Sequence, residues 1–198
     1  MVPQNRATPR QMRMRITLAS GSPQRAEILR KLGVDFEVVV PGVEELTGGD
    51  PECEVVENAR RKARAVGRRG VVVACDTDVV LDGKALGKPE SEREAREYLD
   101  RMSGRAHVVM SGLVVLVDGE ERSGLERTTV VFKPLSDAEK ERYAAFGEWR
   151  GRSGGYAIQT LGSTLVERVE GSVSNVVGLP VGLLAELAPE LLGRDSAA

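Results

Sequence analysis

The hydrophobic positions of this sequence follow two patterns. Short apolar runs rich in valine predict strands, and apolar residues three or four positions apart predict amphipathic helices. The predicted strands cover residues 16–20, 34–40, 71–81, 107–117, 127–132, 156–161 and 164–169. The predicted helices cover residues 23–32 and 51–66, two segments that end near 103 and 146, and a segment after 180. This alternation predicts an α/β fold with a mixed, twisted sheet and flanking helices.

Polar residues at the helix starts support these boundaries. Ser22 followed by Pro23 is typical of an N-cap and the first helical residue. Ser91-x-x-Glu94 and Ser136-x-x-Glu139 both match the capping box, in which a serine and a glutamate bind each other's backbone N–H groups. Two of the predicted helices therefore begin at these serines.

The chain shows no internal repeat and no low-complexity linker, so we expect a single domain over residues 15–194. Residues 1–14 contain several arginines, no acid and no apolar centre like that of a secretory signal. We expect them to form a disordered extension. Because no apolar run is long enough to span a bilayer, we expect a cytoplasmic protein without a membrane partner.

Composition removes several kinds of chemistry. The 198 residues include one histidine and two cysteines, and the net charge is −2. One histidine and two separated cysteines exclude the usual zinc sites and the C-x-x-C redox motif. A net charge near zero gives no general basis for binding nucleic acid, so we expect none as a partner. Catalysis must use other polar side chains, alone or with a metal held by oxygen ligands.

Two cationic side chains lie where the helical pattern calls for apolar residues. Lys62 follows Val55 by seven residues and precedes Val66 by four, inside the apolar stripe of its helix. Arg25 precedes Leu29 by four residues, on the inner face of the preceding helix. Either cation alone would be interpreted as a long side chain that packs its stem on the protein and extends its charge into water. Both cations together, near a helix N-terminus that follows a strand, indicate a site for an anion.

Two acids supply the opposite charge. Glu45 lies in a loop between glycines, and Asp76 lies at the end of the valine run that begins at 71. Mg²⁺ prefers one or two carboxylates together with phosphate oxygens, while cations neutralise the remaining phosphate charge. These residues therefore predict a site for a metal-bound polyphosphate. We interpret His107 as structural, since no second histidine or nucleophile accompanies it.

Two short motifs suggest other enzymes. Gly151-x-Ser153-x-Gly155 fits the nucleophile elbow of hydrolases, but no histidine follows it, so we interpret it as a glycine loop. Asp76-x-Asp78 after a strand is typical of haloacid dehalogenase-type phosphatases, in which one aspartate is the nucleophile. Those enzymes also need a later acidic pair for magnesium, whereas the downstream acids here are scattered. The phosphatase stays an alternative.

Short blocks occur in a fixed order from Ile16 to Leu192. They read Leu18-Ala-Ser-Gly-Ser-Pro-Gln-Arg25, Pro41-Gly-Val-Glu-Glu45, Arg61-Lys-Ala63, Cys75-Asp-Thr77, Leu86-Gly-Lys-Pro89, Ser103-Gly-Arg-Ala-His107, Gly154-Gly-Tyr-Ala-Ile-Gln159 and Glu170-Gly-Ser-Val-Ser-Asn-Val-Val-Gly-Leu-Pro180. Each block alone is weak. Their order and spacing together resemble the Maf family of nucleoside triphosphate pyrophosphatases, historically called septum formation inhibitors.

The resemblance implies a fold akin to the inosine triphosphate pyrophosphatases, with two lobes around a central cleft, a homodimer, and a divalent cation, Mg²⁺ or Mn²⁺. The implied reaction is hydrolysis of a nucleoside triphosphate to the monophosphate and pyrophosphate. The blocks at 156–159 and 175–180 resemble the branch that acts on dTTP and UTP more than the sister branch that acts on 7-methyl-GTP, which stays an alternative.

The resemblance also assigns roles by position. Asp76 matches the family's proton acceptor, and Glu45 matches a member of its phosphate and metal cluster. We expect these two acids to bind the metal. The remaining matches to the phosphate-binding and catalytic cluster are Ser20, Arg25, Lys62 and Lys88, and those to the positions of base selectivity are Thr77 and Gln159.

The chain departs from the family pattern at two positions. The family has two arginines after Ser-Pro, and the first, tied to substrate selection, is Gln24 here. Glutamine lacks the charge and the fork of arginine, so the resemblance does not fix the affinity or the preferred nucleotide. Asp78 stands at a position that is normally apolar, and strand alternation places it on the same face as Asp76. We expect Asp78 to be solvated rather than a metal ligand.

A nucleotide-sensing regulator without enzymatic activity is a further alternative, and Gln24 is the feature that favours it.

Overall fold

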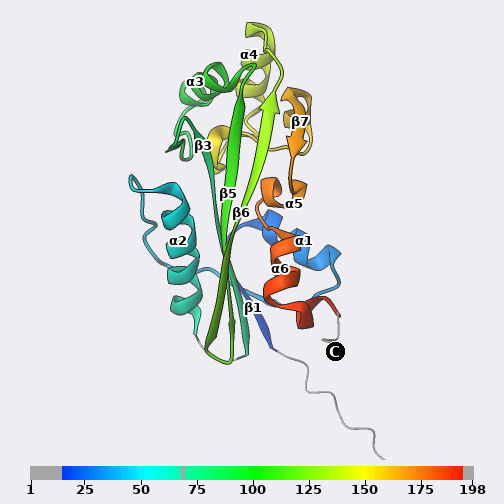
Figure 1. The fold of residues 1–198 in the computed structure, drawn as a ribbon. Helices are drawn as coiled ribbons and strands as arrows, with labels where there is room; N and C mark the ends of the chain where they lie inside the picture. Colours follow the sequence, from blue (N-terminus) through cyan, green and yellow to red (C-terminus); the bar gives the residue numbers. More distant parts are fainter. Residues whose placement is uncertain (1–14, 68–69, 194–198) are drawn as a thin grey trace, which may run out of the picture.

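A seven-stranded mixed sheet forms the spine of the molecule (Figure 1). The computed structural model describes residues 15–67 and 70–193. The strands are β1 (Ile16–Ala19), β2 (Glu37–Val39), β3 (Val71–Leu81), β4 (Lys84–Ala85), β5 (Ala106–Val117), β6 (Glu120–Phe132) and β7 (Val166–Glu170). Their order is β2-β1-β3-β5-β6-β7, with β4 beside β3. The pairs β1–β2 and β1–β3 are parallel and the others antiparallel, which confirms the mixed sheet.

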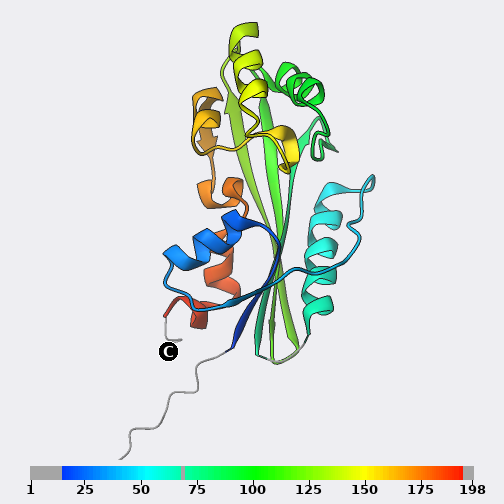
Figure 2. The same cartoon turned by 180° about the vertical axis from the view of Figure 1, so that it is seen from behind.

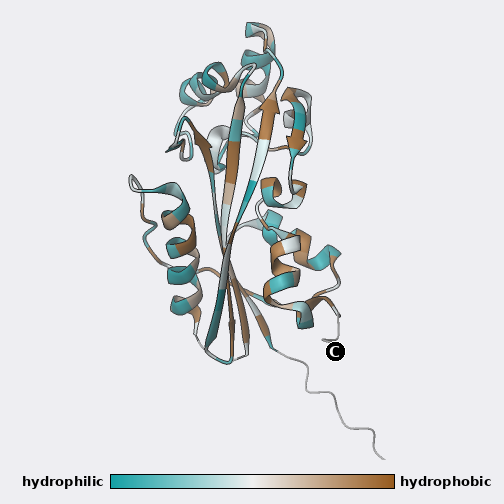
Figure 3. Cartoon of the chain, viewed as in Figure 1, coloured by the Kyte–Doolittle hydropathy of each residue, from teal (hydrophilic) through white to brown (hydrophobic). Residues whose placement is uncertain are grey.

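Helices cover both faces of one half of the sheet. The α-helices of the described residues are α1 (Pro23–Lys31), α2 (Pro51–Val66), α3 (Glu92–Met102), α4 (Asp137–Phe146), α5 (Val173–Val177) and α6 (Val181–Leu187). Helix α2 lies on one face, and α1 and α6 lie on the other (Figures 1 and 2). The side chains of β3 point alternately to the two faces of the sheet. Val73 and Cys75 pack with α1 and α6, whereas Val72 and Ala74 pack with α2. The hydropathy colouring changes repeatedly between teal and brown along α2, as expected for a helix with one buried face (Figure 3).

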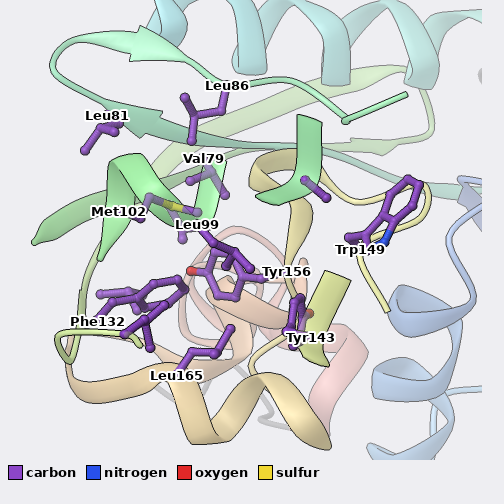
Figure 4. Packing of buried hydrophobic residues seen from close by; sticks show 14 residues of the cluster. Val79, Leu81, Leu86, Leu99, Met102, Phe132, Tyr143, Trp149, Tyr156 and Leu165 are labelled. Atoms are coloured by element: carbon purple, nitrogen blue, oxygen red, sulfur yellow. The ribbon is translucent and has the colours of Figure 1, made fainter. Parts of the chain in front are cut away.

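A separate core fills the other half of the molecule. It joins the far ends of β3, β5 and β6 to α3, α4 and β4 and contains most of the buried aromatic side chains (Figure 4). Phe132, Tyr143, Trp149 and Tyr156 lie in it with Leu99. We call this half the upper lobe and the half around α1, α2 and α6 the lower lobe, as drawn in Figure 1. The two predicted lobes are thus packed on the same long strands, the upper lobe around one hydrophobic core and the lower lobe around one core on each face of the sheet.

The polar stretch Asp76-Thr77-Asp78 lies where β3 passes from one core to the other. Cys75 belongs to the lower core and Val79 to the upper core. Opposite Asp76 on β5 lies Gly112, where a Cβ atom would come within 2.3 Å of the carbonyl oxygen of Val55. This glycine lets the backbone of α2 approach the sheet beside Asp76.

Most predicted elements are confirmed, with several differences. The strand expected over 34–40 is limited to Glu37–Val39, and the two-residue β4 was not predicted. Residues 156–160 form no strand, and β7 begins at Val166 after a 3-10 turn, η2 (Leu161–Leu165). Strand β6 begins at Glu120 rather than 127, because it pairs with β5 along its whole length. Helix α5 was not predicted. The expected extension, residues 1–14, lies outside the described residues.

The two predicted capping boxes differ in detail. Ser136 and Glu139 form both reciprocal hydrogen bonds at the start of α4. At α3 the Ser91 hydroxyl accepts from the Glu94 N–H as expected, but the Glu94 carboxylate accepts from the backbone of Glu90 instead of Ser91. Both serines are N-caps, and only the box of Ser136 and Glu139 is complete.

None of the helices in the described part of the chain is long and apolar enough to cross a membrane.

Candidate active site

A cleft of about 390 Å³ opens where the two lobes meet. The nine residues that the sequence singled out all line it: Ser20, Gln24, Arg25, Glu45, Lys62, Asp76, Thr77, Lys88 and Gln159. They come from the residue after β1, from α1, α2 and β3, and from loops of both lobes. The lower lobe supplies the acids and most of the cations, and the segment 151–159 closes the cleft from the upper lobe. Figure 2 shows α1 and the short turn η1 (Ser153–Gly155), in yellow, on the same side of the sheet.

Lys62 joins the two acids. Its Nζ lies 2.6 Å from Glu45 Oε1 and 2.6 Å from Asp76 Oδ1. Lys62 and Asp76 are each 7% exposed, although both carry charge. A buried ammonium is tolerated only when it is paired and hydrogen-bonded, so the two carboxylates hold Lys62 in place. The position of Lys62 in the apolar stripe of α2 had predicted this inward direction correctly.

Asn58 completes this cluster, and the sequence analysis missed it. Its Nδ2 donates to Asp76 Oδ2 at 3.0 Å and to the Leu46 carbonyl at 3.1 Å, while its Oδ1 accepts from the Leu46 N–H at 2.7 Å. One buried amide therefore positions both Asp76 and the loop that carries Glu45. The available signal was its position four residues before Lys62, on the same helical face.

Glu45 lies at the open side of the cluster. Its second oxygen, Oε2, is 3.6 Å from Nζ of Lys88, whose side chain is more than half exposed. Burial pushes the pKa of Glu45 upward, but the hydrogen bond and charge of Lys62, with a smaller contribution from Lys88, outweigh it and hold the pKa below its ordinary value. Glu45 is therefore an anion at neutral pH.

Ser20, Arg25 and Thr77 form a second polar group at the start of α1. Arg25 Nη1 donates to Ser20 Oγ at 3.1 Å, and Nη2 donates to Thr77 Oγ1 at 3.1 Å. Its Nε donates to the Gly178 carbonyl at 2.8 Å, at the end of α5. These acceptors are neutral, so the charge of Arg25 is fixed in position and remains available to an anion.

Gln24 faces a cation that comes from the other lobe. With its amide oriented so that Nε2 donates to Ser22 Oγ, its Oε1 accepts from both terminal nitrogens of Arg152, at 3.2 and 3.3 Å. Arg152 also lines the cleft. The sequence analysis did not select this arginine, because 128 residues separate it from Gln24 and no local pattern links them.

Asp78 corrects one expectation. It is only partly exposed, and its Oδ1 accepts a hydrogen bond of 2.8 Å from the Ser153 hydroxyl. Burial raises the pKa of Asp78 to about 6, against the lowering effect of Ser153. The expectation of a solvated side chain was wrong, since the turn at 153–155 folds back over this part of β3.

His107 is structural, as predicted. It is 2% exposed, and its Nε2 lies 2.8 Å from the hydroxyl of Tyr156 in the upper core. Burial lowers its pKa to about 4, so the imidazole is neutral at pH 7. Its Nδ1 has no hydrogen-bonding partner among the described residues.

The donor set of the cleft suits a hard divalent cation only in part. Glu45 and Asp76 are held close together by Lys62, and their remaining lone pairs are oxygen ligands of the kind that Mg²⁺ and Mn²⁺ accept. The described residues contain no group of three or more histidine, cysteine or acidic side chains arranged to hold a metal. Two carboxylates fit a cation whose other ligands are phosphate oxygens and water.

Cations gathered around a bridged pair of carboxylates, in a cleft between two lobes of an α/β fold, define a protein that handles phosphate groups. Comparison with known families then gives the particular class: residues 15–191 match the family described as "Maf-like protein". The chain belongs to this family. The resemblance inferred from the sequence blocks is confirmed.

Similar proteins are found in bacteria and archaea. A "dTTP/UTP pyrophosphatase" of Deinococcus radiodurans is 46% identical over 87% of this chain and 91% of its own length. Proteins of the same name from Dictyoglomus thermophilum and Pyrococcus abyssi are 40% and 43% identical, over 91% and 87% of this chain and 97% and 94% of their own lengths.

Among solved structures, the Ham1 protein of Staphylococcus aureus has a TM-score of 0.43 at 15% identity, over 60% of this chain and 71% of its own. That likeness is too low to support an argument. The expected kinship with the inosine triphosphate pyrophosphatases stays a prediction.

Proposed function

We propose that this protein is a nucleoside triphosphate pyrophosphatase that hydrolyses dTTP and UTP to the monophosphate and pyrophosphate. The observation that carries the proposal is the Lys62-bridged pair of Glu45 and Asp76, which shares one cleft with Arg25 and Lys88. The names of relatives that are 40–46% identical over most of the chain support the same substrates.

Asp76 is the proposed base. Lys62 and Asn58 each hold one of its carboxylate oxygens, so its direction in the cleft is fixed before substrate binds. Asp76 accepts a proton from the water that attacks a phosphorus of the α–β anhydride. The anhydride P–O bond breaks, the water oxygen stays on the phosphorus attacked, and pyrophosphate and the nucleoside monophosphate are released.

The cations of the cleft offset the charge of the triphosphate. Arg25, Lys62 and Lys88 approach it from α1, α2 and the loop after β4. Fixed positive groups of this kind stabilise charge that grows on the leaving group, and one such group contributes about 10²- to 10³-fold in turnover. A divalent cation bound by Glu45 and Asp76 would supply further charge neutralisation and a more acidic water.

We assign base selection to Thr77 and Gln159, as the family pattern implies. The Thr77 hydroxyl lies 2.8 Å from that of Ser111 and accepts from Arg25, so it links the phosphate-binding group to β5. Gln159 is exposed at the rim contributed by the upper lobe. The homodimer and the cytoplasmic location stay predictions.

Product analysis tests this function. The protein is incubated with Mg²⁺ or Mn²⁺ and, separately, dTTP, UTP, 7-methyl-GTP and a nucleoside monophosphate, and the products are separated by anion exchange. We expect pyrophosphate and monophosphate in equal amounts from dTTP and UTP. Preference for 7-methyl-GTP would assign the sister branch instead.

Two other outcomes would contradict the proposal. Orthophosphate released from a monophosphate, with a trapped aspartyl-phosphate, would indicate the phosphatase. Measurable nucleotide binding without turnover of any substrate would indicate a sensor.

A further inference from the structure

The cleft contains a cation, Arg152, that lies outside the sequence blocks that resemble the family. The Maf pattern has an arginine at the position of Gln24, and its loss removes one positive charge from the start of α1. Arg152 brings a guanidinium to the same place from the upper lobe, with both terminal nitrogens within 3.3 Å of Gln24 Oε1. The charge absent from position 24 in the sequence is therefore present beside it in space.

The hydrogen bonds of Arg152 leave it able to bind an anion. Its Nε donates to the Glu148 carbonyl at 2.7 Å, and Nη1 and Nη2 each direct one N–H at Gln24. A guanidinium has five N–H donors, so one donor on each terminal nitrogen remains free. All of these acceptors are neutral, and no carboxylate forms an ion pair with Arg152 within the part of the chain that the structure describes. Lys62 and Lys88, by contrast, are paired with acids.

The turn that follows Arg152 is fastened to β3, next to Asp76. Ser153 donates to Asp78 at 2.8 Å and accepts from the Val79 N–H at 3.0 Å. The Gly154 N–H donates to the Gly87 carbonyl at 2.7 Å, one residue before Lys88. A Cβ at Gly154 would meet the Val79 side chain at 2.6 Å, which shows how closely the turn lies on the strand. The segment that contains Arg152 is therefore held rigidly against β3 by the turn that follows it.

We propose that Arg152 is a substrate-binding residue that contacts the triphosphate and takes over the role of the family arginine, with Gln24 orienting its guanidinium. The inference rests on the proposed function. Arg152 would join Lys88 as a second cation that the upper lobe brings to the phosphates, whereas Arg25 and Lys62 belong to α1 and α2 of the lower lobe.

An exchange of charge between the two positions tests the proposal. Four proteins are compared with the parent in dTTP hydrolysis: Arg152→Ala, Gln24→Arg, the double variant, and Arg150→Ala as the matched control. Arg150 is two residues away in the same loop, is exposed and lies over the ring of Trp149, and it does not line the cleft. Thermal unfolding of each protein is recorded beside the kinetics.

The expected values of KM and melting temperature distinguish a loss of substrate binding from a loss of folded structure. Arg152→Ala raises KM for dTTP by about tenfold or more with an unchanged melting temperature, as expected for the loss of a charge-assisted contact. Gln24→Arg lowers KM again in the Arg152→Ala background. In the parent it gives no gain, because two guanidinium groups then share one position. Arg150→Ala stays within twofold of the parent. An Arg152→Ala KM equal to that of the parent, or a raised KM that Gln24→Arg does not lower, would overturn the proposal.

Calorimetric binding of inorganic tripolyphosphate keeps this test independent of the reaction. The affinity should fall about tenfold in Arg152→Ala and recover in the double variant. If the parent hydrolyses no nucleotide but shows this pattern, the proposed function fails and Arg152 remains a phosphate ligand. If the parent hydrolyses dTTP and Arg152→Ala binds tripolyphosphate as the parent does, the function stands and the assignment of Arg152 is wrong.

Discussion

A single ammonium and a single amide determine the geometry of the reactive acids. Lys62 lies between Glu45 and Asp76, and Asn58 holds the other oxygen of Asp76 together with the backbone beside Glu45. Three charges in so small a space are stable because three of the four carboxylate oxygens accept a hydrogen bond and the ammonium of Lys88 lies 3.6 Å from the fourth. At the residue scale, the site is a hydrogen-bonded unit rather than a set of independent side chains.

Replacing Asn58 with alanine should reduce turnover more than binding. The Leu46 N–H loses its acceptor, and one oxygen of Asp76 is no longer held, so we expect kcat to fall by about 10- to 100-fold, the range found when a residue that orients a reactive group is lost. KM should change by less than about threefold. Steady-state kinetics with dTTP give both values.

Asn175→Ala is the control for stability. Asn175 is a fully buried asparagine that donates to the Val109 carbonyl and to Thr128 and contacts neither acid of the cleft. Each variant should lose about 1–3 kcal/mol of unfolding free energy, since a buried partner is left unsatisfied. Equal losses of kcat in both would show that Asn58 acts through stability alone.

The sequence predicted most of the polar residues of this cleft, for identifiable reasons. Lys62 interrupts an apolar helical stripe, and Asp76 ends a run of buried valines, so both departures are visible locally. Asn58 is a polar residue on the same helical face as Lys62, and the pattern of that face gave no reason to single it out. Arg152 contacts Gln24 only because the two lobes pack together. Contacts between distant segments carry no signal in one sequence.

At the scale of elements, the contact between α2 and the sheet positions the site. Gly112 on β5 faces the backbone of α2 at Val55, and Asp76 is its partner on β3. The helix can come close only where the strand has no side chain. Lys62, two turns further along α2, thereby reaches Asp76.

Gly112→Ala should separate α2 from the sheet. The added methyl group would lie 2.3 Å from the Val55 carbonyl oxygen, so the backbone must move, and we expect a loss of about 1–3 kcal/mol in unfolding free energy. Gly182→Ala in α6 is the control, because nothing lies within 4 Å of its Cβ position. It should be neutral or stabilise the fold by up to about 1 kcal/mol. Denaturant unfolding measures both, and equal effects would contradict the account of α2 packing.

Elements with regular periodicity were predicted well, and irregular ones were not. The segment 156–161 contains apolar residues at strand-like spacing, but Tyr156 is buried in the upper core and the Ala157 N–H donates to the Tyr143 hydroxyl at 3.0 Å instead of to a strand. Helix α5 is only five residues long, too short to show a helical repeat. In both places tertiary contacts decide the backbone conformation.

At the scale of the whole molecule, the long strands β3 and β5 contribute to the cores of both lobes, and the reactive residues lie between the lobes. The lower core is aliphatic, whereas the upper core has aromatic residues and the only histidine of the chain. A change in the upper core therefore reaches the cleft through β3 and through the turn at 153–155.

The buried histidine makes the stability of the molecule depend on pH. The pKa of His107 is about 4 in the folded protein and about 6.5 in an unfolded chain, so the unfolded state takes up the proton first. Its contribution to stability is full above pH 6.5 and is lost as the pH falls toward 4. Between pH 7 and pH 5 we expect this residue to cost about 2 kcal/mol of unfolding free energy.

His107→Gln isolates this contribution, since glutamine does not titrate and can still bond to Tyr156. Denaturant unfolding at pH 7 and pH 5 should show a smaller fall in stability for the variant than for the parent. A difference between pH 7 and pH 5 that is the same in both proteins would mean that His107 is not buried in its neutral form.

The most direct test of the central claim is the rate of pyrophosphate release from dTTP by Asp76→Asn. Asparagine keeps the shape of the side chain but cannot accept a proton from water, so we expect a loss of about 10²- to 10⁴-fold in kcat. Asp78→Asn, two residues along the same face of β3, should lose less than about tenfold, because asparagine can still accept from Ser153. Undiminished release of pyrophosphate by Asp76→Asn would contradict the account.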